Sequence, residues 1–312
     1  MCGWLAATAS LLRPVYHTMK LLLLASKVIA TDDTPMKVLD RSKKKNIKLG
    51  RIWIHYGDDH NPVNLFDYTT GRGREGPRTF LKGFKGYLLG DCFSGNQALC
   101  AETGCVHVAC NAHARRNFIK AEPNNKAACA EVLRMYDELF RIERDARELG
   151  VSGEQLKRMR EEESKPLLDK MKAWLDDHSL SALPKSTFGK SVNYCLNNWK
   201  ELNNFLLDGD LRLDNNLAEQ EMKRVAINRK NSLFFGSDQG GEDAVIFMSI
   251  ISTCRRHNVD PFAYLKDVIE RLSANPDEDL LQLLPHTWKR QEQSSEIEGV
   301  PATPKYILPV PV

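Results

Sequence analysis

Apolar residues near the start of the chain recur every three or four positions, which is the spacing of one helical face. They fall within residues 4–26, where Pro14 is an awkward residue for a helix interior. The stripe consists of Leu11, Leu12, Val15, Met19 and Leu22. This pattern predicts a helix over residues 4–26.

From residue 27 the apolar runs become rich in β-branched and aromatic residues, with turn signals such as Gly-Asp-Asp-His-Asn-Pro between them. These runs predict five strands, at residues 27–39, 50–57, 63–70, 86–91 and 106–110. The fourth run is apolar almost throughout, as in a strand buried on both faces. A short helix is expected at 73–84, and another follows the fifth strand.

Helical spacing returns from about residue 122 to 208, where three apolar stripes follow one another. Pro166 is expected to break or kink the second stripe, and Ser152 with Gln155 has the pattern of a capping box. Helices are expected again at residues 214–228, 242–258 and 260–272, before a tail that is first polar and then proline-rich.

This order of elements describes a mixed sheet in which three antiparallel strands are followed by strands with helical crossovers. Such a sheet is ribonuclease-H-like, an analogy of fold that carries no chemistry by itself. We therefore expect an α/β fold with a ribonuclease-H-like mixed sheet, an inserted α-helical module and C-terminal helices. The expected parts are an N-terminal helix at 1–26, a core in two pieces at 27–121 and 209–275, the helical insertion at 122–208 and a tail at 276–312.

Composition indicates a globular protein but does not indicate its function. The chain has 312 residues, 42% hydrophobic and 27% charged, and its net charge of +3 does not by itself indicate a nucleic-acid partner. Its eight cysteines are too dispersed for a disulfide framework, which favours a reduced, cytoplasmic protein. The apolar run at 21–30 is too short for a membrane span. Lys27 interrupts it, which argues against its being the apolar part of a signal peptide.

Acidic residues mark the expected ends of two neighbouring strands. Asp32 is placed at the end of the first strand and Asp91 at the end of the fourth, and Glu219 on a later helix can complete the group. Three converging carboxylates form an oxygen-rich site suited to Mg²⁺ or Mn²⁺, which activates a water or a 3′-hydroxyl toward a phosphodiester. The alternative is that Asp32 starts a turn before Pro35 and that Asp91 caps the following helix.

Basic residues cluster in three places where a phosphate backbone could bind. The clusters are Lys43, Lys44 and Lys45 in the turn between the first two strands, Arg115 and Arg116 after the fifth strand, and Lys223, Arg224, Arg229 and Lys230 on the helix of Glu219. A solvated surface is the alternative reading of each cluster.

Cysteine and histidine residues form a loose candidate site for a softer metal ion. Cys100, Cys105, Cys110 and His113 could bind Zn²⁺, although their spacing also fits buried cysteines. His113 precedes Arg115 and is expected near the strand ends, where it would support the metal ligands or contact phosphate. A satisfied core histidine is the alternative.

Six stretches, in the same order, resemble the insertion-sequence-66 family of bacterial transposases. They are TDDTPMKVLD at 31–40, GYLLGDCFSGNQAL at 86–99, CNAHARRNF at 110–118, LDNNLAEQEMKRVAINRKNSLFFGSDQGGEDA at 213–244, VDPFAYLKDVIERL at 259–272 and LLPHTW at 283–288. The first two resemble the segments with the family's two catalytic Asp residues, and the fourth resembles the segment with its catalytic Glu. The resemblance runs from about residue 4 to residue 288.

The resemblance implies a DNA transposase with a ribonuclease-H-like core, in which the family's acidic triad falls on Asp32, Asp91 and Glu219 and requires Mg²⁺ or Mn²⁺. It also implies DNA as substrate, a homo-oligomer on paired transposon ends, accessory proteins of the same element and a bacterial, nucleoid-associated location. The departures from the family pattern are Asp33, Phe93, Asn111 and Arg224, and none belongs to the triad. Family members carry a further N-terminal region, so residues 1–26 are expected to be the remnant of one.

We therefore expect metal-dependent DNA strand transfer, with nicking at transposon ends followed by attack of the 3′-hydroxyl on target DNA. One alternative is an inactive, truncated transposase that only binds DNA or a full-length partner. Another is a metal-dependent nuclease with a different substrate.

Helical geometry separates the two glutamates of the last motif. At about 100° per residue, Glu219 and Glu221 point about 200° apart, so only one of them can face the strand ends. Asn215, Glu219 and Lys223 share a face at i, i+4 spacing. We expect this face to meet metal and phosphate, with Asn215 supporting Glu219, and we expect Glu221 to be solvated.

Overall fold

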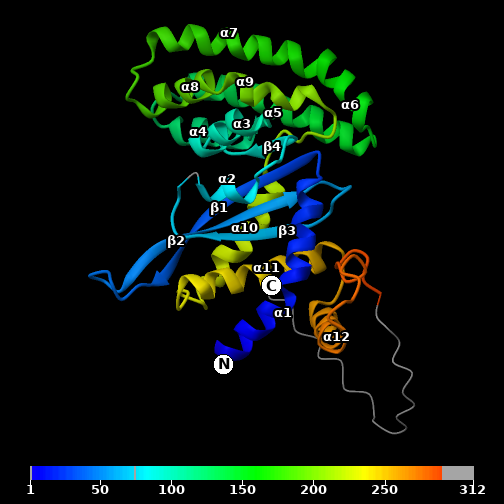
Figure 1. Ribbon diagram of the computed structural model, residues 1–312. Coiled ribbons are helices and arrows are strands. Elements are labelled where there is room, and N and C mark those ends of the chain that lie inside the picture. Colours follow the sequence, from blue (N-terminus) through cyan, green and yellow to red (C-terminus); the bar gives the residue numbers. More distant parts are fainter. Residues whose placement is uncertain (1, 74, 290–312) are drawn as a thin grey trace, which may run out of the picture.

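The computed structural model describes residues 2–73 and 75–289 and has a mixed α/β fold. Residues 290–312, which include most of the expected tail, lie outside the described residues. In Figure 1 a five-stranded sheet lies in the middle of the molecule, with a group of helices above it and the C-terminal helices below.

The sheet contains β1 (Val28–Leu39), β2 (Ile47–Gly57), β3 (Asn64–Thr69), β4 (Tyr87–Gly90) and β5 (Val106–Ala109). Its strand order is β3-β2-β1-β4-β5. Strands β1, β2 and β3 are antiparallel neighbours, whereas β4 is parallel to β1 and β5 is parallel to β4. The five predicted strands are confirmed, and the apolar fourth strand has a neighbour on each side.

Helices precede, connect and follow these strands. Outside the helical insertion these are α1 (Cys2–Leu24), α2 (Glu75–Phe80), α3 (Ser94–Thr103), α4 (Asn111–Ala121), α10 (Asn216–Asn228), α11 (Asp238–Arg256) and α12 (Pro261–Ala274). The helical insertion comprises α5 (Lys126–Glu148), α6 (Gly153–Met159), the π-helical turn η1 (Arg160–Ser164), α7 (Lys165–Ser181), α8 (Thr187–Asn197), α9 (Trp199–Asn203) and the 3-10 turn η2 (Asn204–Leu207).

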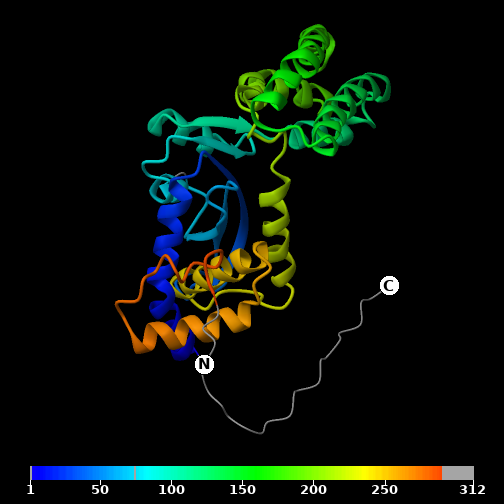
Figure 2. The same cartoon turned by 90° about the vertical axis from the view of Figure 1, so that its right-hand side faces the viewer.

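Different helices cover the two faces of the sheet, because side chains alternate between the faces along each strand. On one face, Ile54 and Leu89 share a core with Met222 of α10 and with the helical insertion. On the other face, Ile29 and Leu88 share a core with residues of α1, α2, α3, α11 and α12. Figure 2 shows α1 and α10 on opposite sides of the strands. Helix α10 therefore packs on the same face of the sheet as the helical insertion.

The expected break at Pro166 is confirmed, because the π-helical turn η1 interrupts the helix directly before it and Pro166 stands in the first turn of α7. Two other helix predictions are wrong. Ser152 precedes α6 but its side chain makes no capping hydrogen bond, so the capping-box prediction is wrong. Helix α11 starts at Asp238 rather than at residue 242, because the Ser237 hydroxyl accepts from the Gly240 N–H at 3.1 Å and caps the helix.

Cys100 and Cys105 are joined by a disulfide, so the expectation of reduced cysteines is wrong for this pair. Within residues 2–73 and 75–289, none of the helices has both the length and the apolar character needed to cross a membrane.

Candidate active site

Asp32 lies in the interior of β1, not at its end. Strand β1 continues to Leu39, and Asp32 pairs with Ile54 of β2. The parallel pairing with β4, in contrast, stops at Ala30 and Leu89. The prediction that Asp32 ends the strand is therefore wrong, and Asp32 lies just beyond the point where β1 loses β4 as a neighbour. Ala30 belongs to the core that includes α10, and alternation along the strand places Asp32 on that same face.

Glu219 lies in the first turn of α10, and Asn215 fixes where this helix begins. The buried side chain of Asn215 donates to the carbonyl oxygen of Thr31 at 2.7 Å. Its backbone N–H donates to Sγ of Cys110 at 3.2 Å. One residue thus ties α10 both to β1 and to the end of β5. Since Thr31 adjoins Asp32 in the strand, this contact brings Glu219 toward Asp32.

Asp32 and Glu219 line the same cavity, which has a volume of about 460 Å³. His113, Arg116 and Lys223 line it as well. Acidic side chains from β1 and α10 therefore line the same open depression as basic and imidazole side chains. A depression lined by charged and imidazole side chains can take a polar or ionic ligand.

The carboxylate of Asp32 is unfavourably placed as an anion. Burial, together with the nearby carboxylates of Glu219, Asp33 and Asp91, raises the pKa of Asp32 to about 7. The Asp33 N–H, which donates to Oδ1 of Asp32 at 2.8 Å, acts in the opposite direction and only partly offsets this effect. The site therefore gathers more negative charge than the protein alone neutralises.

The neighbouring carboxylate of Asp33 differs, because it has cationic partners of its own. Nη1 of Arg51 lies 2.5 Å from its Oδ2, and Nη2 of Arg72 lies 3.1 Å from its Oδ1. The Asp33 side chain is only 6% exposed. Both Asp32 and Asp33 line the cavity, but the carboxylate of Asp33 is held in an internal ion-pair network, whereas that of Asp32 has no cationic partner among the ion pairs of the described residues.

Asp91 immediately follows β4 and lies near Asp32, but it does not line the cavity. Its Oδ1 accepts from the Phe93 N–H at 3.2 Å and from Nδ2 of Asn96 at 3.4 Å. Its charge contributes to the raised pKa of Asp32. The structure thus brings Asp32 and Glu219 into one cavity and places Asp91 within electrostatic range, where it also orders the turn before α3.

Glu219 is approached by two side chains of α4. Nη2 of Arg116 lies 3.2 Å from its Oε2, and Nδ1 of His113 lies 3.4 Å from its Oε1. The His113 contact has the distance of an ion pair but not the geometry of a hydrogen bond, and both of these atoms are buried without a hydrogen-bond partner. Oδ1 of Asn215 is buried without one too. Such atoms are rare in folded proteins and indicate room for a further ligand.

These features fit a divalent cation. A cation beside Asp32, Asp91 and Glu219 would stabilise the ionised carboxylate of Asp32, whose pKa is raised by burial and by the neighbouring carboxylates. The Oε1 atom of Glu219, which has no hydrogen-bond partner, is the oxygen ligand that Mg²⁺ and Mn²⁺ prefer. The residues present therefore suit the predicted ion.

Glu221 is not solvated, so that prediction is wrong. Its side chain is 16% exposed, and its Oε1 lies 3.2 Å from Nε of Arg224. Its Oε2 accepts from the hydroxyl of Ser252 in α11 at 2.8 Å. Glu221 does not line the cavity, which agrees with the helical geometry, but the flank of α10 that carries it packs against α11 instead of facing water.

The basic residues expected to contact DNA fall into two groups. Exposed lysines are Lys43, Lys44 and Lys45 in the β1–β2 turn, and Lys223 and Lys230 on and just after α10. Arginines bonded inside the protein are Arg115 (to Asp137), Arg116 (to Glu219), Arg224 (to Glu221) and Arg229 (to the carbonyl oxygen of Pro35). The exposed lysines are therefore the stronger candidates for phosphate contacts, because the arginines would first have to give up their partners within the protein.

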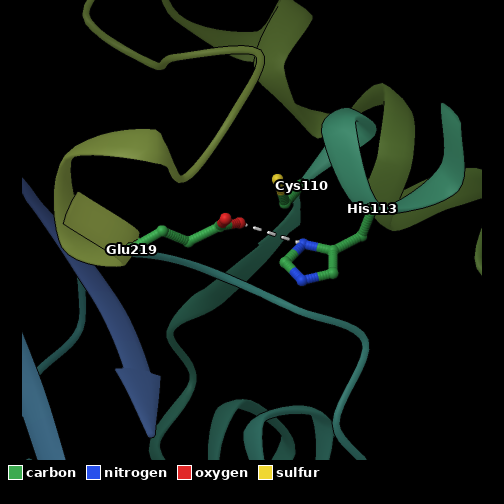
Figure 3. A group of neighbouring side chains, drawn as sticks. All are labelled: Cys110, His113 and Glu219. Carbon is green, nitrogen blue, oxygen red and sulfur yellow. Dashed lines mark ion pairs between the residues drawn. The ribbon is translucent and has the colours of Figure 1, made fainter. Parts of the chain in front are cut away.

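The four candidate zinc ligands do not come together. Cys100 and Cys105 form the disulfide and belong to the core that includes α1. Cys110, which follows β5, and His113 in α4 lie beside Glu219 instead, with one ligand atom from each within 4.8 Å of the others (Figure 3). The interpretation of all four as one zinc site is wrong. Sequence reasoning missed the grouping that replaces it, which we call the Cys110–His113–Glu219 cluster.

Comparison with known proteins identifies the family. A family model described as "Transposase IS66 family" matches residues 1–243, and one described as "IS66 C-terminal element" matches residues 249–286. The chain belongs to the IS66 transposase family, which confirms the resemblance inferred from its motifs.

Relatives in the curated set are longer than this chain. Uncharacterized protein y4hP of Sinorhizobium fredii (strain NBRC 101917 / NGR234) is 34% identical over 307 residues, which cover 91% of this chain and 54% of the relative. Uncharacterized protein y4jD of the same strain is 30% identical, with 93% of this chain and 59% of the relative covered. The chain thus spans a little over half the length of these relatives. No solved structure gave a significant match.

Proposed function

We propose that this chain is the catalytic core of a DDE-type DNA transposase, which hydrolyses phosphodiester bonds at transposon ends and transfers the resulting 3′ ends to target DNA. The observation that carries the proposal is the meeting of Asp32 and Glu219 in one cavity, with Asp91 close by. Membership of the IS66 transposase family supports DNA as the substrate.

The sheet supports a ribonuclease-H-like core. Three antiparallel strands occupy one side, the first strand is central, and two parallel strands complete the order β3-β2-β1-β4-β5. In this arrangement Asp32 on β1 and Asp91 after β4 come from adjacent parallel strands. Glu219 reaches them from α10, which packs over β1 and β2. The topology thus supports the proposal that these three acidic residues, which are distant in sequence, act together.

Asp32, Asp91 and Glu219 would hold Mg²⁺ or Mn²⁺, which when bound supplies activation of the attacking oxygen and stabilisation of the leaving oxygen. Arg116 holds Glu219 by its Oε2 atom, and Asn215 anchors the start of α10 to β1. Lys223 extends the cavity with a positive charge that can bind the scissile strand by its phosphates. We further propose that active complexes contain more than one copy of the chain, because two transposon ends must be joined.

The matched pair Glu219→Gln and Glu221→Gln tests this proposal. Glu219→Gln removes a carboxylate from the cavity and is expected to abolish nicking. Glu221→Gln keeps an oxygen that can accept from Ser252, so its nicking rate is expected to stay close to that of the unaltered chain. Nicking of DNA carrying the element's terminal repeats, in Mg²⁺ and in Mn²⁺, gives both rates.

The reverse pattern in this pair would overturn the assignment of Glu219. Salt-sensitive DNA binding by the unaltered chain, with no cleavage even in Mn²⁺, would instead support the alternative of a transposase that only binds DNA or a partner. Cleavage of unrelated DNA at the same rate as terminal-repeat DNA would favour a general nuclease.

A further inference from the structure

The Cys110–His113–Glu219 cluster offers one sulfur, one nitrogen and one oxygen ligand, which is a different chemistry from that of the carboxylate triad. The three ligand atoms lie within 4.8 Å of one another. Figure 3 shows the imidazole of His113 directed at the carboxylate of Glu219, with the sulfur of Cys110 beside them. Cys110 follows β5, His113 lies in the first turn of α4 and Glu219 in the first turn of α10. The cluster therefore depends on the tertiary fold.

Backbone N–H groups surround the sulfur of Cys110. The Asn215 N–H donates to Sγ at 3.2 Å, and the amides of Ala112 and His113 face the same atom. Cys110 is also the N-cap residue of α4, where the helix dipole is positive. Burial, together with the charge of Glu219, raises the pKa of the Cys110 thiol to about 11, so the cluster without a cation holds the neutral thiol.

The other two members of the cluster have atoms that the protein leaves unsatisfied. Nδ1 of His113 and Oε1 of Glu219 are 3.4 Å apart, buried and without hydrogen bonds. Oδ1 of Asn215, at the start of the Glu219 helix, is in the same condition. Buried polar atoms without partners are costly, and a cation between the sulfur, nitrogen and oxygen ligands would satisfy them.

We propose that the Cys110–His113–Glu219 cluster binds one Zn²⁺ ion, distinct from the hard-ion site of the acidic triad. Zn²⁺ accepts thiolate, imidazole and carboxylate ligands together, whereas Mg²⁺ binds oxygen ligands and does not select sulfur. Three protein ligands leave a fourth tetrahedral position for water or for an oxygen of the nucleic acid. On binding, the thiol of Cys110 gives its proton to solvent, and the metal–sulfur bond replaces the S–H bond.

If the proposed function holds, Glu219 is a ligand of both the zinc site and the acidic triad. Because the same carboxylate belongs to both the cluster and the triad, Zn²⁺ competes with Mg²⁺ for it. Zn²⁺ added to a Mg²⁺-dependent nicking reaction is therefore expected to slow it, and Cys110→Ser is expected to weaken this inhibition.

Cobalt binding tests the proposal without DNA or catalysis. The full chain is titrated with Co²⁺, which takes the coordination of Zn²⁺ and absorbs light. We expect one equivalent to bind, with the visible bands of tetrahedral cobalt and a thiolate-to-cobalt charge-transfer band, and Zn²⁺ to displace it. Cys110→Ser is expected to abolish the charge-transfer band, and His113→Gln to weaken Co²⁺ binding by at least about tenfold.

Cys92→Ser is the matched control, since Cys92 is a free thiol next to Asp91 and outside the cluster. It is expected to leave the band unchanged. Thermal unfolding checks that Cys110→Ser folds. If it does not fold, the test rests on the Co²⁺ affinity of His113→Gln, since the His113 side chain is partly exposed and its replacement is better tolerated. Absence of a thiolate band in the unaltered chain, or its loss in Cys92→Ser but not in Cys110→Ser, would overturn the proposal.

Asp91→Asn separates this proposal from the proposed function. It removes a triad carboxylate and leaves all three cluster ligands, so the cobalt spectrum is expected to persist. An intact cobalt spectrum in an unaltered chain that does not nick DNA would contradict the proposed function and leave the zinc site standing. Nicking without any thiolate band would contradict the zinc site alone, and would leave His113 with the role of positioning Glu219.

Discussion

Asp32→Asn is expected to reduce metal-dependent nicking at least about a thousandfold, which corresponds to about 4 kcal/mol of transition-state stabilisation. Asparagine keeps the shape of the side chain and the oxygen that accepts from the Asp33 N–H, but it loses the charge that would bind the cation. The same change removes repulsion from Glu219 and Asp91, so the free energy of unfolding without metal is not expected to fall. Initial nicking rates and thermal unfolding, with and without Mg²⁺, measure the two effects.

Asp33→Asn is the matched control, one residue along the same strand. It leaves Arg51 and Arg72 without their carboxylate, which is expected to cost about 1–3 kcal/mol of stability. Most of the nicking activity is expected to remain, because Asp33 is engaged by these arginines. Equal loss of nicking in both variants, or normal nicking by Asp32→Asn, would contradict the role assigned to Asp32.

Arg160→Met is expected to destabilise the fold by about 3–5 kcal/mol, the largest effect on stability that we predict. The Arg160 side chain is 1% exposed and bonds both carboxylate oxygens of Glu143, at 2.7 and 2.8 Å. It also donates to the carbonyl oxygens of Phe205, Asp208 and Leu211. Methionine fills a similar volume but leaves a partly buried carboxylate and three carbonyl groups without these donors.

The effect is large because Arg160 joins α5, η1 and the segment that leads back to α10. Arg141→Met is the control, since Arg141 lies in α5, is 43% exposed and forms ion pairs with Glu138 and Asp145 of the same helix. Such surface pairs contribute about 0–1 kcal/mol. Equilibrium urea unfolding, followed by circular dichroism, compares the variants. Similar losses in both would show that Arg160 has no special structural role.

The elements of this fold follow largely from the spacing of apolar residues, because strands and helices repeat their faces with different periods. The five strand runs and the helix that carries Glu219 occur where that spacing predicts them. Boundaries shift where tertiary contacts extend an element. Strand β2, for example, begins at Ile47 because β1 continues to Leu39 and pairs with it there.

The errors in the predicted site have a common physical origin, which is that each depended on a contact between distant segments. Asp32 is interior to β1, as the predicted strand at 27–39 already implied, and what the sequence does not give is that the pairing with β4 stops at Ala30, just before Asp32. Helical periodicity gives the direction of Glu221 but not the presence of Ser252 of α11 in that direction. Similarly, the spacing of Cys110 and His113 does not reveal that α10 covers them.

One signal could have led to the cluster from the sequence. Strands β4 and β5 were both predicted, and as parallel neighbours they end at the same edge of the sheet. Asp91 and Cys110, which directly follow β4 and β5, are therefore neighbours by topology. A helix that brings Glu219 to Asp91 also brings it near Cys110.

Asp91 is the member of the triad whose replacement tests the proposed metal centre most directly. Asparagine preserves the Oδ1 atom that accepts from Phe93 and Asn96, so Asp91→Asn changes charge while the turn before α3 is retained. The measurement is the initial rate of Mg²⁺-dependent nicking of DNA that carries the element's terminal repeats. We predict that the unaltered chain nicks this DNA and that folded Asp91→Asn does not; equal rates for the two would contradict a centre built from Asp32, Asp91 and Glu219.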